Sequence, residues 1–252
     1  MRAILTYHSI DDSGSPISID EAGFRRHVEW LASGAVRVLP LDHILTPGSG
    51  RVDETERDAV ALTFDDGLRS VERIALPLLR DHGLPATVFL VSGAMGGTNA
   101  WGGNVDPRVP QLPVMDWNGA RRLADAGIVL GAHSRTHSHL SRLSADAIED
   151  EVLRSCEGIR EEVGTRVTAF AYPYGDADDR VRSTVARHCE LACGTELRWL
   201  RDGEDPHWLP RLDAYYLRGR GRLEAWGSAR FRLVLDVQGR ARRLRRQLAR
   251  SA

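Results

Sequence analysis

Residues 59–67 read Ala-Val-Ala-Leu-Thr-Phe-Asp-Asp-Gly, and this stretch decides the fold. A continuous apolar run predicts a strand buried on both faces, as in a parallel sheet covered by helices. The run ends in two adjacent carboxylates, Asp65 and Asp66, followed by Gly67, which can turn the chain. Two like charges at the end of a buried strand disfavour each other's ionisation, and a cation beside them removes that cost. One carboxylate can then bind a metal ion while the other stays free as a base. The alternative interpretation is an acidic turn that caps the next helix.

Strands and helices alternate on both sides of this stretch. The pattern predicts a parallel-stranded α/β fold in a single domain over residues 1–218, followed by an Arg-rich helical extension over residues 219–252. Further strands are expected at residues 3–7, 36–39, 86–91, 128–132, 167–171, 191–194 and around 208–214. Helices are expected at residues 20–31, 68–82, 116–126, 144–163 and 178–188, with a polar connector at 47–56.

Polar side chains lie where these strands are expected to end. They are His8, Asp65, Asp66, His133 and Tyr174. Catalytic groups in such folds gather at the carboxyl ends of the strands, so we expect these side chains to meet. The irregular segment 93–113 is either part of a substrate cleft or a disordered insertion.

Composition excludes several classes of protein. The 252 residues carry a net charge of -1, which gives no overall attraction to nucleic acid. All 34 basic residues are arginine, so no phosphate-binding or Schiff-base lysine exists. The three cysteines form no Cys-x-x-Cys pair, which argues against a thiolate zinc site. No signal peptide or membrane span is recognised, and a cytoplasmic protein is expected.

The segment His133-Ser-Arg-Thr-His137 places two imidazoles four residues apart, on one face if the segment forms a helical turn. Alone, such a pair is a weak signal. Together with an aspartate from another strand end it supplies two histidines and one carboxylate, a ligand set that leaves a position open for water.

These motifs resemble those of the polysaccharide deacetylases of carbohydrate esterase family 4, which share the NodB-homology domain. Residues 63–67 match the first motif, residues 133–137 the second and, in degenerate form, residues 172–175 the third. The resemblance covers roughly residues 3–215 and implies a distorted (β/α)-barrel of about seven parallel strands. It also implies metal-dependent hydrolysis of N-acetyl groups on sugars.

The resemblance assigns a role to each matched residue. Asp65 is the general base, while Asp66, His133 and His137 bind the metal ion. The backbone N–H of Tyr174 is offered to the oxyanion. The metal is expected to be Zn²⁺, although Co²⁺, Ni²⁺ or Fe²⁺ also suits these ligands.

The sequence departs from the family at two places. Ala171 stands where the third motif has an arginine that orients the base, and Arg211 is the candidate replacement, paired with Asp65 or Asp213. The late Leu-x-His motif that supplies the acid is missing. His8 is the candidate general acid, as in the permuted poly-N-acetylglucosamine deacetylase-like subgroup; the alternative is a structural histidine.

We therefore predict a metal-dependent hydrolase that removes an N-acetyl group from an amino-sugar-containing substrate. The expected substrate is a biosynthetic intermediate, linked to a nucleotide or a lipid, or a glycosylated metabolite. Two alternatives remain: a hydrolase of the same fold acting on a cyclic amide or ureide, and a non-catalytic sugar-binding module.

The C-terminal segment 239–250 is dense in arginine, with Leu244 and Leu248 at helical spacing. Such a run is usually a solvated helix face. It is also suited to contact with an anionic membrane surface or a protein partner.

Overall fold

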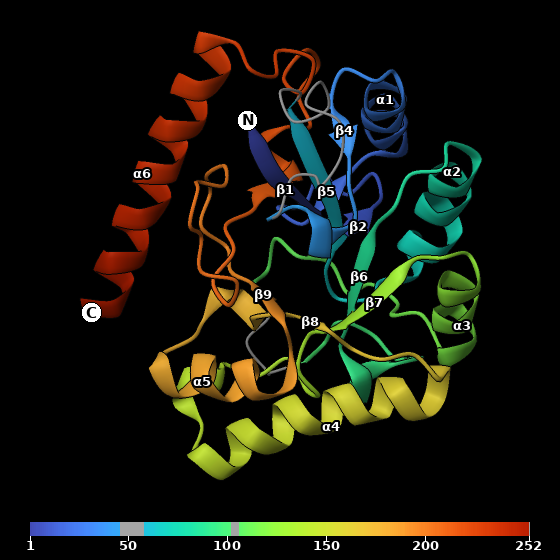
Figure 1. The fold of residues 1–252 in the computed structure, drawn as a ribbon, viewed down its shortest axis with the longest axis vertical. Coiled ribbons are helices and arrows are strands. Elements are labelled where there is room, and N and C mark those ends of the chain that lie inside the picture. Colours follow the sequence, from blue (N-terminus) through green and yellow to red (C-terminus); the bar gives the residue numbers. More distant parts are fainter. Residues whose placement is uncertain (46–57, 102–105, 252) are drawn as a thin grey trace.

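The computed structural model describes residues 1–45, 58–101 and 106–251, so the connector expected at 47–56 and residues 102–105 of the segment 93–113 lie outside the described residues. A curled sheet of parallel strands forms the centre (Figure 1). Its strands follow the order β10-β1-β5-β6-β7-β8-β9, and a short strand, β4, pairs with the start of β5. They are β1 (Arg2–Tyr7), β4 (Arg37–Val38), β5 (Ala59–Phe64), β6 (Thr87–Leu90), β7 (Val129–Ala132), β8 (Ala169–Ala171), β9 (Leu191–Cys193) and β10 (Leu212–Asp213). A separate parallel pair joins β2 (Ser9–Ile10) to β3 (Ser18–Ile19).

Helices follow the strands and cover the outside of the sheet (Figure 1). Asp20, Asp116, Ser144 and Asp178 each cap a helix, and each side chain accepts a backbone N–H of the first turn. The helices are α1 (Glu21–Ala32), α2 (Leu76–Asp81), α3 (Trp117–Asp125), α4 (Ala145–Val163), α5 (Asp179–His188) and α6 (Ala229–Ser251). This arrangement confirms the predicted single-domain, distorted (β/α)-barrel with seven parallel strands in sequence around the sheet.

The alternation of side chains along each strand explains why polar groups collect at one end of the barrel. In β5, Val60, Leu62 and Phe64 face the helices, whereas Ala59 and Ala61 belong to the inner cluster of buried side chains. The same period of two places Thr63, within the strand, and Asp65, just past its end, on the inner side. In β1 the same period leads from Ile4 through Thr6 to His8, and the hydroxyls of Thr6 and Thr63 lie 2.8 Å apart.

One irregular segment connects the two edges of the sheet. Leu209 exchanges backbone hydrogen bonds with Ala192 and Gly194 beside β9, whereas Leu212 and Asp213 pair with β1. The strand expected around 208–214 is therefore shorter than predicted, because Pro210 has no N–H to donate to a ladder. Arg211, in the middle of this segment, lies inside the barrel and is only 1% exposed.

The C-terminal part of the described chain forms the 23-residue helix α6, which runs along one side of the molecule (Figure 1). Phe231 and Leu235 are its buried contacts with the rest of the protein. Within residues 1–45, 58–101 and 106–251, no helix is long and apolar enough to cross a bilayer.

Candidate active site

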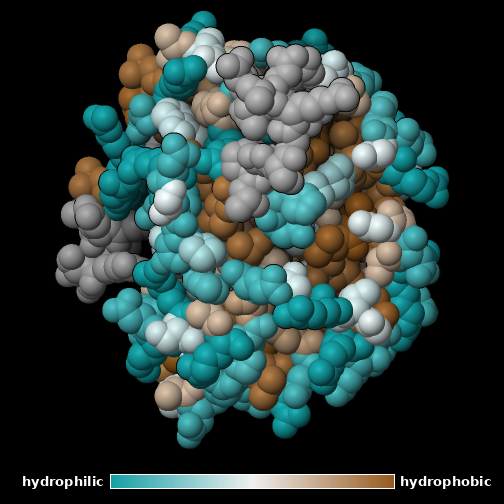
Figure 2. Space-filling view, viewed as in Figure 1, coloured by the Kyte–Doolittle hydropathy of each residue, from teal (hydrophilic) through white to brown (hydrophobic). Residues whose placement is uncertain are grey.

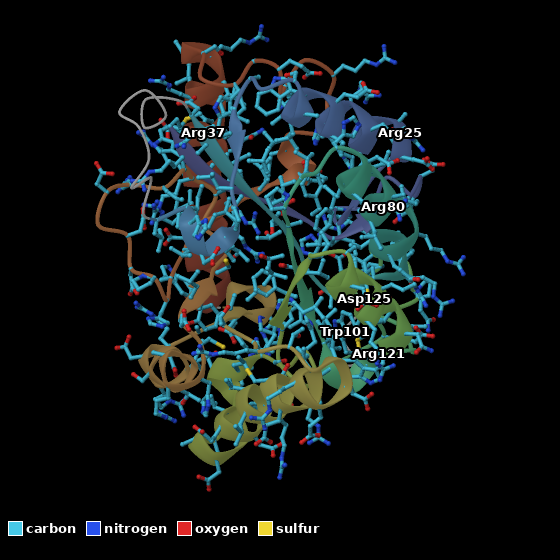
Figure 3. All side chains as sticks on the ribbon, turned by 45° about the vertical axis from the view of Figure 1, so that its right-hand side comes forward. Arg25, Arg37, Arg80, Trp101, Arg121 and Asp125 are labelled. Carbon is cyan, nitrogen blue, oxygen red and sulfur yellow. The ribbon has the colours of Figure 1, made fainter. Side chains whose placement is uncertain are left out.

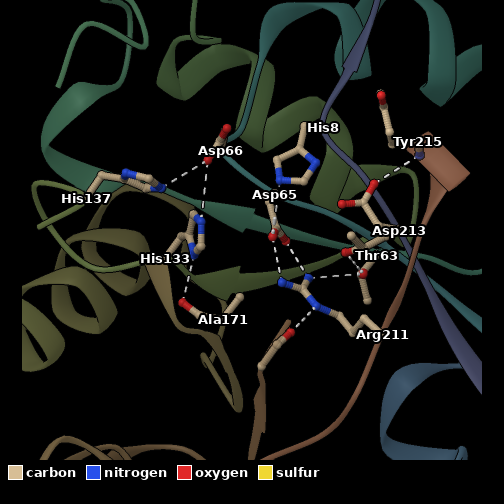
Figure 4. Close-up of polar contacts among 12 residues, drawn as sticks. His8, Thr63, Asp65, Asp66, His133, His137, Ala171, Arg211, Asp213 and Tyr215 are labelled. Carbon is tan, nitrogen blue, oxygen red and sulfur yellow. Dashed lines mark hydrogen bonds and ion pairs between the residues drawn. The ribbon is translucent and has the colours of Figure 1, made fainter. Parts of the chain in front are cut away.

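The predicted site residues meet around one cavity of about 420 Å³ at the carboxyl ends of the strands. Figure 4 labels all of them except Tyr174. These residues come from five different parts of the barrel. The cavity is lined by His8 after β1, Asp65 and Asp66 after β5, His133 and His137 after β7, Tyr174 after β8, and Arg211 before β10. The structure therefore brings together all seven residues that the sequence nominated.

Asp66, His133 and His137 form a compact buried cluster. The Oδ1 atom of Asp66 lies 3.4 Å from the Nε2 atom of His133 and 3.4 Å from that of His137. One ligand atom from each residue lies within 4.8 Å of the other two, so a single ion can contact all three (Figure 4). This cluster is a candidate metal site.

A hydrogen bond fixes the tautomer of His133, and two other atoms of the cluster lack a hydrogen-bond partner among the described residues. Its Nδ1 atom lies 2.7 Å from the carbonyl oxygen of Ala171, which can only accept, so Nδ1 carries the proton in the neutral ring. A lone pair of Nε2 then faces the carboxylate of Asp66. Among the described residues, the buried Oδ1 of Asp66 and Nδ1 of His137 have no hydrogen-bond partner. Facing lone pairs and an unpartnered carboxylate oxygen fit a divalent cation bound between them.

The charges around the cluster also favour a cation. Burial by itself raises the pKa of Asp66, but its interactions with His133 and His137 hold that pKa well below the ordinary value. For His133, burial lowers the pKa, and the carboxylates of Asp66 and Asp65 outweigh this and raise it. Burial lowers the pKa of His137. The two carboxylates thus stabilise positive charge at this point of the site.

Asp65 is held by a two-pronged ion pair with Arg211. The Nη1 and Nη2 atoms of Arg211 donate to Oδ1 and Oδ2 of Asp65 at 2.6 and 2.7 Å, and Nε donates to the carbonyl of Gly194 at 2.9 Å. Burial raises the pKa of Asp65, but the charge of Arg211 lowers it below its ordinary value. Of the two partners considered for Arg211, the structure selects Asp65 rather than Asp213.

His8 lies on the side of the cavity next to Asp65. Its Nε2 atom is 3.8 Å from Oδ2 of Asp65, too far for a direct hydrogen bond, and its side chain is 19% exposed. His8 therefore faces the open cavity.

Aromatic rings surround His137. The rings of Trp101 and Tyr174 lie 4.7 and 4.5 Å from its imidazole, and the ring of His139 stacks on Tyr174 at 4.1 Å. Trp101, from the segment 93–113, and Tyr174 both line the cavity. They give its wall flat apolar surfaces beside the candidate metal site.

The segment from His133 to His137 is not the helical turn that the spacing of four suggested. Ser134 and His137 have φ values of 60° and 59°, which a right-handed turn does not allow, and the Oγ of Ser134 accepts the His137 N–H at 2.9 Å. Asp66 and Tyr174 are also left-handed, at 71° and 59°. These four are the only non-glycine residues with positive φ among those described, and all four lie in this site.

Sequence reasoning missed the residues that support this segment. The buried Glu151 of α4 accepts the Thr136 N–H at 2.9 Å and the Thr136 hydroxyl at 2.7 Å, and Ser155 donates to the carbonyl of Ser134 at 3.0 Å. Nothing in the sequence distinguishes Glu151 from the exposed acidic residues of the same helix. Arg242 of α6 was missed as well: it lines the cavity and pairs with Asp213 at 3.6 Å.

A family model described as polysaccharide deacetylase matches residues 52–192. The chain is 29% identical over 119 residues to a peptidoglycan-N-acetylglucosamine deacetylase of Bacillus cereus, a match that covers 46% of this chain and 36% of the relative. The chain spans 56% or less of the length of the curated relatives it matches.

Solved structures share the fold. IcaB from Ammonifex degensii superposes with a TM-score of 0.71 at 21% identity, covering 85% of this chain and 93% of that one. Streptococcus pyogenes deacetylase PplD, solved with acetate, gives 0.69 at 19% identity, covering 84% and 91%.

Proposed function

This chain belongs to the polysaccharide deacetylase family, and from that membership we propose that it is a metal-dependent hydrolase that removes the N-acetyl group from an amino-sugar-containing substrate. The observation that carries the proposal is the pairing of two neighbouring carboxylates with different surroundings. Asp66 faces two imidazoles, whereas Asp65, the next residue, is fixed by Arg211. A binding module has no need of the second, separately held carboxylate.

Asp66, His133 and His137 would hold the divalent metal ion, with Zn²⁺ as the first candidate and Co²⁺, Ni²⁺ or Fe²⁺ as alternatives. Such an ion supplies Lewis-acid chemistry, since it acidifies water and polarises an amide carbonyl. The hydrogen bond from His133 Nδ1 to Ala171 keeps the Nε2 lone pair directed at the site.

Asp65 would be the general base. Arg211 keeps it ionised and fixes its plane, while each carboxylate oxygen keeps acceptor capacity for a proton. The proton of the attacking water passes to Asp65 as the water oxygen bonds to the acetyl carbon. The lowered pKa of Asp65 makes it a weaker base, so the attacking water must be more acidic than bulk water for its proton to pass to Asp65.

His8 would be the general acid. It faces the cavity from the side of Asp65, and its imidazolium can donate a proton to the amide nitrogen as the carbon–nitrogen bond breaks. Acetate and a free amine are then the products. Tyr174 is the left-handed residue of the 3-10 turn Pro173–Gly175, and its backbone N–H would stabilise the oxyanion.

The aromatic wall supports a sugar as the group that carries the acetamide. Sugar rings stack on aromatic faces, and Trp101 and Tyr174 offer such faces beside the metal ligands. Within the class of acetylated amino sugars we propose an intermediate linked to a nucleotide or lipid, or a glycosylated metabolite.

The proposal is tested by measuring acetate released from a panel of compounds. The panel holds free, nucleotide-linked and lipid-linked N-acetylhexosamines, short N-acetylglucosamine oligomers, and a cyclic amide and a ureide. We expect acetate from at least one acetylated sugar, loss of activity with a chelator, and recovery when a divalent metal is restored. Turnover of the ureide or cyclic amide without acetate would contradict the proposal.

Asp65→Asn separates catalysis from metal binding. We expect it to lower kcat by about 10²–10⁴-fold, the contribution typical of a general base, with bound metal unchanged. Asp125→Asn, at an exposed position on α3, is the matched control and should keep full activity (Figure 3). Equal kcat in the two variants would show that Asp65 is not the base.

A further inference from the structure

Charge is divided unequally along this chain. Residues 218–252 hold 11 arginines and two acidic residues, Glu224 and Asp236, for a net charge of +9. Residues 1–217 hold the other 23 arginines and 33 acidic residues, for a net charge of -10. The overall value of -1 therefore hides a strongly basic extension on an acidic body.

The acidic body does not neutralise this extension. Eight arginines lie in residues 218–244, and Arg242, paired with Asp213 at 3.6 Å, is the only one in an ion pair within the described residues. Arg218 donates to the carbonyls of Ser15 and Ser18. The remaining six are exposed to solvent: Arg220, Arg222, Arg230, Arg232, Arg240 and Arg243. Their charges are available to an anionic partner.

Helix α6 also presents an apolar stripe to solvent. Leu233, Val237 and Leu244 are 64%, 58% and 58% exposed, although Phe231 and Leu235 of the same helix are buried. At 3.6 residues per turn the three exposed side chains fall within an arc of about 40°. Apolar side chains lie among polar ones along the edge of the molecule where α6 runs (Figure 2). The helix thus has one face on the protein and one apolar, arginine-flanked face that is exposed to solvent.

A cavity of about 410 Å³ lies where α6 meets the loop before it. The residues that line it combine apolar ones, among them Leu217, Phe231 and Leu235, with Arg220, Arg222 and Arg230. Apolar surface bordered by arginines suits a molecule that has both a hydrocarbon part and a phosphate. The cavity and the stripe therefore point to the same chemistry.

We propose that α6 and the loop before it dock on the surface of an anionic phospholipid bilayer. Leu233, Val237 and Leu244 enter the interfacial region, and the arginines bind headgroup phosphates. A second copy of the chain is disfavoured, since two helices of the same charge would repel each other. A nucleic acid would leave the apolar stripe unused. The acidic body is repelled by the same bilayer, so the molecule docks through this face alone.

Docking has a consequence for the catalytic cavity. Arg242, on the side of α6 that faces the protein, lines that cavity. The cavity is therefore held roughly one helix diameter, about 10 Å, from the docked face. Docking itself needs no turnover and does not rest on the proposed enzyme function.

The test is sedimentation of the full chain with vesicles of phosphatidylcholine alone or mixed with phosphatidylglycerol. We expect binding only to the anionic vesicles, and weaker binding at high salt. The Asp66→Asn variant should bind equally well, which separates this proposal from the catalytic one. A chain that stays in the supernatant with the anionic vesicles would overturn the proposal.

Three triple variants locate the docking surface. Arg232→Gln/Arg240→Gln/Arg243→Gln should weaken binding about 100-fold, at about fivefold per arginine. Leu233→Ser/Val237→Ser/Leu244→Ser should also lose binding, although its charge is unchanged. The control Arg25→Gln/Arg80→Gln/Arg121→Gln changes net charge equally on α1, α2 and α3, across the molecule from α6, and should bind like wild type (Figures 1 and 3).

Two results would contradict this assignment. Equal loss in the control and the arginine variant would show that overall charge, not α6, governs binding. Unchanged vesicle binding in the leucine–valine variant, together with loss of a dimer in gel filtration, would identify a second copy as the occupant of the stripe. Circular dichroism confirms that each variant is folded.

Discussion

Arg211 offsets the unfavourable burial of the charged Asp65 side chain. Both side chains are almost fully buried, and every polar contact of the guanidinium is inside the barrel. We predict that Arg211→Met lowers the free energy of unfolding by about 3–5 kcal/mol, because a buried charge loses its partner. Urea denaturation measures this. Adding Asp65→Asn should recover part of the loss; a double variant less stable than the single one would show that the ion pair is not the cause.

The buried His27, away from the catalytic site, should make the stability of the protein sensitive to acid. Its Nδ1 atom lies 3.0 Å from the Tyr7 hydroxyl and its Nε2 atom 3.2 Å from the Leu217 carbonyl, and burial lowers its pKa from 6.5 to about 4. Between pH 6.5 and about 4, His27 is therefore protonated in the unfolded chain but neutral in the folded chain. Stability is full above pH 6.5 and falls as the pH drops toward 4, by about 3 kcal/mol for this group.

Urea unfolding of wild type and His27→Gln across this pH range measures the contribution. Glutamine keeps one donor and one acceptor but does not titrate. The variant should lose less stability on acidification, and parallel pH profiles would rule out His27 as the source.

At the scale of elements, α4 acts as the support of the His133–His137 segment. Glu151 accepts hydrogen bonds from the Thr136 N–H and hydroxyl. Replacing Glu151 changes no metal-ligand atom, but it should let the neighbouring His137 move. We predict that Glu151→Ala weakens metal affinity by about 10–100-fold, measured by calorimetric titration of metal-free protein. The metal affinity of Glu151→Gln, which can still accept the Thr136 N–H, should lie between that of wild type and that of Glu151→Ala. Glu161→Ala, exposed on the same helix, should match wild type.

The elements themselves were largely predictable from the sequence. The buried strand at 59–64 and the capped helices α1, α3, α4 and α5 follow from apolar periodicity and cap residues, which act locally. The local shape around His137 did not follow, because left-handed Ser134 and His137 are held by contacts with a distant helix. The partner of Arg211 was also beyond local patterns, since residue 65 lies 146 positions away.

For the molecule as a whole, the candidate metal site joins loops that follow different strands. Asp66 follows β5, and the two histidines follow β7, so an ion bound by all three would stabilise the folded state but not the unfolded chain. We predict that stripping the metal with a chelator lowers Tm by about 5–10 °C, and that metal restores it. Differential scanning calorimetry measures both steps. Asp66→Asn should show no response to chelator; a wild-type Tm that also ignores chelator would argue against a bound ion.

The four left-handed residues, Asp66, Ser134, His137 and Tyr174, have a bearing on how this protein can be engineered. Each is held in a conformation that an L-amino acid adopts at an expense of about 1–3 kcal/mol, which glycine would avoid. In metal-free protein, where Asp66 and His137 bind no ion, a library sorted only for heat resistance will therefore enrich glycine at these positions. Selection for durability and selection for turnover pull these positions in opposite directions, so each round of such a screen has to be scored for both.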